Sequence, residues 1–147
     1  MTQRNPMIVC LDMDCFFVSV ERQLNPHLKD TPVIVGAKPE KRGVVAACSY
    51  ETRKAGIYSG MSSYQAKIRC PEAVFVSPRI SVYKAYSNAV YRFLKHYVPV
   101  VHQASIDEFY LDLSGCEKES VDGSRFMWSL KNTIDKELGL PSSIGIG

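Results

Sequence analysis

Two groups of acidic residues interrupt apolar stretches of this 147-residue chain, and both would be costly to bury. Asp12 and Asp14 follow one apolar run, and Asp107 and Glu108 lie inside another. An ionised carboxylate beside an apolar strand is unfavourable unless it is paired, and a neighbouring carboxylate adds repulsion. No Lys or Arg lies within four residues of Asp107 and Glu108. The pattern therefore indicates a divalent cation as the partner, and oxygen ligands favour Mg²⁺.

Length and composition allow one substantial core in a globular chain, and they narrow the partners and the cellular compartment that we expect. The net charge is only +3, which permits a phosphate-rich partner without indicating one. An odd number of irregularly spaced cysteines favours free thiols in a reducing compartment over disulfides or a zinc site. These cysteines are Cys10, Cys15, Cys48, Cys70 and Cys116. We expect neither a signal peptide nor a membrane span, and therefore a cytoplasmic location with no membrane partner.

Hydrophobic periodicity and turn residues predict alternating strands and helices. Strands are expected over residues 7–11, 33–35, 43–47, 74–76, 98–102 and 109–113, with another beginning near 142. Helices are expected over residues 15–24, 50–55, 63–68, 81–97 and 123–138. This order predicts an α+β fold with a mostly antiparallel sheet and helices on one face. The Asp12 strand should be central, beside a hairpin carrying Asp107. Because the chain stops within a strand, we expect a piece of a longer protein.

Two of these helices have a predicted core face at helical spacing. The helix over residues 15–24 would bury Phe16, Phe17, Val20 and Leu24. The helix over residues 81–97 would bury Val82, Tyr86, Ala89, Val90, Phe93 and Tyr97. Ser62 is predicted to cap the helix over residues 63–68.

The residues alone leave three assignments open. Asp14 is either a second ligand on the strand face of Asp12 or the N-cap of the following helix. Asp107 and Glu108 could form a polar hairpin tip, although they lack the residues that tight turns favour. Phe17 fits a core aromatic by its spacing. Three converging carboxylates could hold two Mg²⁺ ions, which indicates metal-dependent phosphoryl or nucleotidyl transfer.

Three segments, in this order, resemble the Y-family translesion DNA polymerases, with the DNA polymerase IV-like branch closest. They are LDMDCFFVSVE at residues 11–21, SYETRKAGI at 49–57 and SIDEFYLD at 105–112. The resemblance implies a palm over residues 1–14 and 80–147 and a small α/β fingers subdomain over 15–79. The thumb and little finger would be absent from this chain. The implied activity is DNA-directed DNA synthesis past damaged bases, in DNA repair, although the fragment alone could be inactive.

The resemblance also implies roles for individual residues. Asp12 and Asp107 would bridge two Mg²⁺ ions, Glu108 would bind the catalytic ion, and the Met13 carbonyl would bind the other. Further positions match residues that contact the incoming nucleotide or roof the nascent base pair. Phe17 would be a steric gate against the 2′-hydroxyl, Tyr50 and Arg53 would bind triphosphate oxygens, and Val44, Ala46 and Gly60 would form the roof.

The implied partners are primer-template DNA and a dNTP, with a sliding clamp recruited through C-terminal parts outside this chain, and the protein is expected to be a monomer. Two other classes remain open. A haloacid-dehalogenase-type phosphatase would use Asp12 as nucleophile and Asp14 as general acid, and it needs a parallel sheet. A palm-like domain kept as a non-enzymatic binding module is the second.

Overall fold

The computed structural model describes residues 8–113 and 124–146, which form two compact units. The first unit comprises residues 8–14, 84–113 and 124–146, and the second unit comprises Cys15–Tyr83. Met7, Cys116 and Gly123, which the sequence analysis includes, lie outside the described residues. Among the described residues, no helix combines the length and the apolar character needed to cross a membrane.

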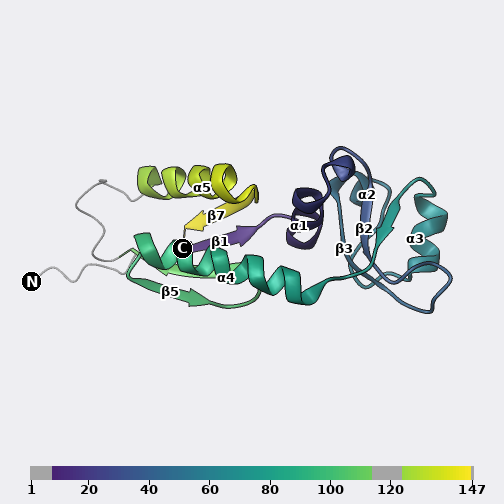
Figure 1. The fold of residues 1–147 in the computed structure, drawn as a ribbon, viewed down its shortest axis with the longest axis horizontal. Helices are drawn as coiled ribbons and strands as arrows, with labels where there is room; N and C mark the ends of the chain where they lie inside the picture. The colour runs from purple at the N-terminus through teal and green to yellow at the C-terminus, as the bar shows by residue number, and fades with distance from the viewer. Residues whose placement is uncertain (1–7, 114–123, 147) are drawn as a thin grey trace, which may run out of the picture. The chain divides into compact units, whose positions relative to one another are not determined.

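The first unit contains a four-stranded sheet in the order β5-β6-β1-β7 (Figure 1). Every neighbouring pair in it is antiparallel. Its strands are β1 (Ile8–Met13), β5 (Val100–Gln103), β6 (Glu108–Asp112) and β7 (Ser142–Ile146). The prediction of an α+β fold is confirmed, as is the central place of the Asp12 strand beside the hairpin of β5 and β6.

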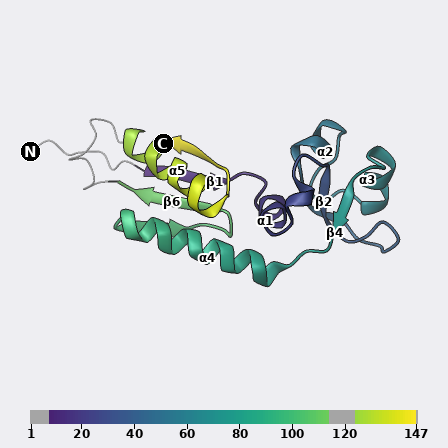
Figure 2. The ribbon, with the colours of Figure 1, turned by 45° about the horizontal axis from the view of Figure 1, so that its top comes forward.

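Buried and more exposed side chains alternate along the strands of this sheet, so one face of the sheet is buried and the other is open. In β1, Leu11 and Met13 are buried, whereas Asp12 between them is exposed. Strand register extends the separation to β6, because Leu11 lies opposite the buried Phe109 and Asp12 lies opposite Glu108. The helices of this unit are α4 (Ile80–Tyr97), which begins in the second unit, and α5 (Ser124–Leu138), which packs beside β7 (Figure 2). The acidic residues therefore lie on the side of β1 that its core leaves open.

The second unit is built on a three-stranded sheet in the order β3-β2-β4. Its elements are α1 (Phe16–Leu24), the short 3-10 helix η1 (Pro26–Leu28), β2 (Val33–Gly36), β3 (Val45–Cys48), α2 (Tyr50–Lys54), α3 (Ser63–Arg69) and β4 (Val74–Val76). Every residue of β2 is buried, as expected for a central strand. β2 runs antiparallel to β3 and parallel to β4. The unit is a small mixed α/β structure with its own core around Ile34 and Val45.

The alternative that made Asp14 the N-cap of the first helix is wrong, whereas the predicted cap of α3 is confirmed. Cys15, not Asp14, precedes α1, and it has a left-handed backbone with φ 42° and no side-chain cap. Asp14 is held at the end of the sheet, because its N–H donates to Pro141 O at 2.9 Å and its Oδ1 accepts from Ser143 Oγ at 2.5 Å. At α3, Ser62 Oγ accepts from the N–H of Gln65 at 3.4 Å.

The predicted core faces of two helices are partly wrong, for one physical reason. The fully buried residues of α1 are Phe16, Val18, Val20 and Glu21, while Leu24 is exposed. The fully buried residues of α4 are Tyr83, Ser87, Val90 and Leu94, while Tyr97 is exposed. Each buried face includes a polar residue with hydrogen-bond partners, which a count of apolar residues cannot include. Both faces are therefore rotated from the predicted ones.

Of the described cysteines, Cys10, Cys15, Cys48 and Cys70 take part in no disulfide.

Candidate active site

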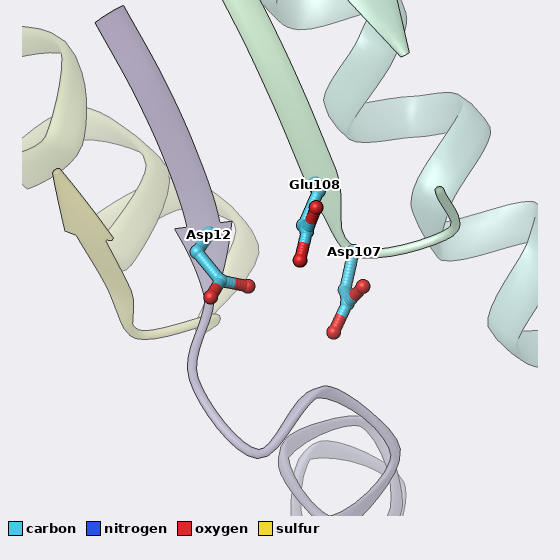
Figure 3. Close-up of side chains that lie close together, drawn as sticks. All are labelled: Asp12, Asp107 and Glu108. Atoms are coloured by element: carbon cyan, nitrogen blue, oxygen red, sulfur yellow. The ribbon is translucent and has the colours of Figure 1, made fainter. Parts of the chain in front are cut away.

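Three carboxylates converge at one end of the first unit's sheet (Figure 3). Asp12 comes from the end of β1, Glu108 begins β6, and Asp107 belongs to the connection just before β6. Each offers an oxygen atom, and these atoms all lie within 4.8 Å of one another. The structure thus brings together the three residues that the sequence analysis selected as metal ligands.

Backbone hydrogen bonds fix this arrangement. Asp12 and Glu108 are direct cross-strand partners, and the N–H of Met13 donates to Asp107 O at 2.9 Å. The hydroxyl of Ser105 donates to Asp107 Oδ1 at 2.9 Å, so the turn also orients a carboxylate. Asp107 therefore does lie at a hairpin tip, as one alternative had it, and the same tip places its side chain beside Asp12.

The electrostatics of the cluster are unfavourable without a cation. Partial loss of hydration, followed by the negative charges of Asp107, Glu108 and Asp14, raises the pKa of Asp12 above its usual value. Within residues 8–113 and 124–146, no Lys or Arg forms an ion pair with Asp12, Asp107 or Glu108. Like charges directly opposite each other in a sheet are destabilising. Such a set of oxygen ligands fits a divalent cation.

Met13 and Asp14 differ from these three residues. The Met13 side chain is buried, so its backbone is the only part available to a ligand. Asp14 lies outside the convergent group, since its Oδ1 is bonded to Ser143. The alternative in which Asp14 is a paired metal ligand therefore has no support from this geometry.

In the second unit, the structure brings together Tyr50 and Arg53, the two residues chosen for a triphosphate. Both are exposed on α2, and the Arg53 guanidinium carbon lies 5.3 Å from the centroid of the Tyr50 ring. A phenol and a guanidinium on one helical turn present O–H and N–H donors together. The two side chains therefore share a face of α2.

The three candidate roof residues also lie close together in the second unit. Val44 and Ala46 are exposed on either side of the buried Val45, so both face away from the core. The N–H of Gly60 donates to Val45 O at 2.8 Å, which ties the following turn to this strand. Gly60 has φ +94°, and an added Cβ would meet nothing within 4 Å. The surface around it is open, and its glycine is required by the backbone conformation.

Phe17 is half-buried on α1, and sequence reasoning missed what supports it. Its ring stacks on that of Tyr83, which in turn bonds to Glu21. The signal was present in the sequence, because Phe17 and Glu21 are four residues apart and must share a helix face. A carboxylate on an otherwise apolar helix face needs a partner. The partner in the structure is Arg79, which the sequence does not identify.

The sheet topology argues against the phosphatase alternative. That class needs β1 in a parallel sheet, but both neighbours of β1 run antiparallel to it. The alternative also gave no role to Asp107 and Glu108, which lie beside Asp12.

Comparisons with known proteins agree on one protein family. The model of the impB/mucB/samB family matches residues 11–147. DNA polymerase IV of Clostridium perfringens is 42% identical over 144 residues, which are 98% of this chain and 40% of that protein. DNA polymerase IV of Clostridioides difficile is 46% identical over 140 residues, which are 95% of this chain and 38% of that protein. The chain thus spans about 40% of the length of these relatives.

Solved structures give the same result. DinB from Sulfolobus solfataricus matches with a TM-score of 0.89 at 32% identity, over 96% of this chain and 42% of that chain. An insertion ternary complex of Dbh DNA polymerase matches with a TM-score of 0.89 at 30% identity, over the same shares of the two chains.

Proposed function

Because the chain belongs to the impB/mucB/samB family, we propose that it is the N-terminal catalytic part of a Y-family DNA polymerase. In the longer protein it would join a dNTP to a primer 3′-hydroxyl, including opposite damaged template bases. The convergence of Asp12, Asp107 and Glu108 carries this proposal. Its palm would be residues 1–14 and 80–147, and its fingers 15–79, close to the bounds of the two compact units.

We assign two Mg²⁺ ions to the three carboxylates. Asp12 and Asp107 would contact both ions, Glu108 the ion nearer the primer, and the Met13 carbonyl the ion nearer the nucleotide. When bound, such ions lower the pKa of a hydroxyl nucleophile and stabilise charge on a leaving phosphate. The chain contributes the fixed geometry, since the strand register and the Met13–Asp107 hydrogen bond hold the carboxylates before any ion binds.

The second unit would supply the nucleotide contacts. Tyr50 and Arg53 would bind triphosphate oxygens, and Arg53 suits this role because a guanidinium binds phosphate through two parallel hydrogen bonds. Phe17 would be the gate that excludes a 2′-hydroxyl. Val44, Ala46 and Gly60 would roof the nascent base pair, and their exposed, small surface would leave room for a distorted template base.

The partners would be those of a polymerase. Primer-template DNA and a dNTP are the substrates, and a sliding clamp would bind through parts of the longer protein outside this chain. The protein would act as a cytoplasmic monomer.

Primer extension by the longer protein that carries this chain tests the proposal. Asp107→Ala should abolish extension, and Phe17→Ala should admit ribonucleotides. Glu72→Ala, at an exposed carboxylate that is not a member of the convergent group, is the matched control and should extend normally. Undiminished synthesis by Asp107→Ala would refute the metal assignment. A wild-type protein that binds DNA and Mg²⁺ but extends no primer would favour the binding module.

A further inference from the structure

Glu21 is a buried charge that the proposed catalytic machinery does not use. It lies on α1 and is 1% exposed. An ionised carboxylate is strongly unfavourable in such a place unless hydrogen bonds and a counter-charge satisfy it. The hydrogen bonds that satisfy such a carboxylate fix its own position and also the positions of the side chains that donate them.

Two residues from the start of α4 and the segment before it satisfy Glu21. Tyr83 donates its hydroxyl to Glu21 Oε2 at 2.7 Å, and Arg79 Nε donates to the same oxygen at 3.1 Å. Arg79 Nη2 contacts the other oxygen, Oε1, so the guanidinium binds the carboxylate through two nitrogens. Bidentate pairs of this type are strong and fix direction as well as distance. The Tyr83 ring, which is fully buried, is therefore held at its hydroxyl end.

The anchored Tyr83 ring in turn supports Phe17. The rings of Tyr83 and Phe17 are stacked, with their centroids 4.3 Å apart and their planes 19° apart. Phe17 is itself one helical turn before Glu21, so the carboxylate and the aromatic ring share a face of α1. Tyr83 thus covers one face of the Phe17 ring and blocks movement of that ring toward it.

We propose that Glu21 is a positioning residue for sugar selection, acting through Tyr83 and Arg79 to keep the Phe17 ring from yielding to a 2′-hydroxyl. The inference rests on the proposed function, specifically on Phe17 as the gate. A gate excludes a hydroxyl only if it cannot move by about the size of that group. The stacked and anchored Tyr83 ring supplies that resistance.

The test is single-nucleotide insertion by the longer protein, with kcat/KM measured for a dNTP and for the matching ribonucleotide. Glu21→Gln and Tyr83→Leu should each lower the preference for the dNTP by about tenfold, within the range that one small group is worth in a shaped pocket. The change should come from a rise in ribonucleotide use. Arg79→Lys keeps the charge and should retain most of the preference, whereas Arg79→Leu should lose part of it.

Matched controls separate this effect from general damage. Glu72→Gln removes an exposed carboxylate, and Tyr86→Leu removes a half-buried tyrosine from α4 outside the Glu21 cluster; neither should change the preference. An equal loss of dNTP and ribonucleotide insertion in the Glu21 and Tyr83 variants would mean a merely structural role and would overturn the proposal. If Glu21→Gln does not fold, the ratio of kcat/KM for the dNTP to that for the ribonucleotide in Tyr83→Leu and Arg79→Leu tests the proposal instead.

Phe17→Ala separates the gate role of Phe17 from the positioning role of Glu21. If it leaves the sugar preference unchanged, Phe17 is not the gate and the assignment of that residue fails. If it relaxes the preference while folded Glu21→Gln and Tyr83→Leu proteins select as the wild type does, the gate stands and the positioning role of Glu21 is wrong.

Discussion

Replacement of Asp12 by Asn should stabilise the chain when no metal is present. Asp12 is exposed, has no cationic partner among the described residues and faces Glu108 directly across the sheet. Its raised pKa has the same sign, because a carboxyl that is harder to ionise in the folded state weakens folding once the pH exceeds its unfolded pKa. Removal of the charge relieves this repulsion while it keeps the shape of the side chain.

The magnitude follows from the geometry. The ligand oxygens of Asp12, Asp107 and Glu108 lie within 4.8 Å of one another. Two unit charges at that distance repel by about 0.9 kcal/mol in a water-like medium and by about 3.5 kcal/mol at an effective dielectric constant of about 20. The lower figure suits an exposed residue, and two repulsions are relieved. We expect a gain of about 1–2 kcal/mol in the free energy of unfolding, or about 3–6 °C in Tm.

Thermal unfolding in EDTA measures the gain in stability without metal, and thermal unfolding in Mg²⁺ measures the stabilisation that the ion provides. A ligand at a hundred times its Kd stabilises a folded protein by about 2.7 kcal/mol, and Asp12→Asn should lose most of that gain. The order of stabilities should therefore reverse between the two buffers. Glu40→Gln, at an exposed carboxylate of the second unit, should follow the wild type in both. An Asp12→Asn protein that is less stable in EDTA, or that gains as much from Mg²⁺, would refute the reasoning.

Three further predictions come from other contacts. Burial and the bond to Glu21 raise the pKa of Tyr83 from 10.0 to about 12, so the phenol should contribute a stability loss of up to about 2.7 kcal/mol as pH rises from 10 to 12, where it ionises only in the unfolded chain. Denaturant titrations over this pH range should show a larger loss of stability in the wild type than in Tyr83→Phe. Arg53→Ala should weaken dNTP binding in the longer protein, while Lys54→Ala on the same helix should not, as fluorescence titration can measure. Ser87→Ala should cost about 1–3 kcal/mol in urea unfolding, since it leaves the carbonyl of Ile106 without its 2.6 Å hydrogen bond.

The sequence was most informative where a pattern is local. Apolar runs located the strands of both sheets, and turn residues separated them, so each predicted strand was found within two residues of its place among the described residues. The central position of β1 could also be inferred, because its continuous apolar run requires cover from neighbours. Convergence of Asp12 with Asp107 followed from chemistry rather than from pattern: each charge needed a partner that its own segment lacks.

Long-range polar contacts were the part that sequence patterns could not supply. Glu21 and Arg79 are 58 residues apart, and nothing local in either segment shows that they meet. The same is true of Asp14 and Ser143, whose hydrogen bond replaced the predicted helix cap. Because a polar residue counts as solvent-facing in a hydrophobic pattern, the buried Glu21 and Ser87 also displaced the predicted core faces of α1 and α4.

The buried carboxylate of Glu21 and the open carboxylate cluster around Asp12 have different roles: the first supports neighbouring side chains, and the second is a binding site. Glu21 is buried and receives hydrogen bonds from Arg79 and Tyr83, so its charge is already satisfied and has no affinity left for a metal. Asp12, opposite Glu108 at the open end of the sheet, has no such partner among the described residues, so its charge favours a ligand that arrives from solvent. Substitution at Glu21 should therefore change sugar preference while the Mg²⁺ dependence of insertion stays the same. Substitution in the Asp12 cluster should change the Mg²⁺ dependence first, because there the missing partner is the ion itself.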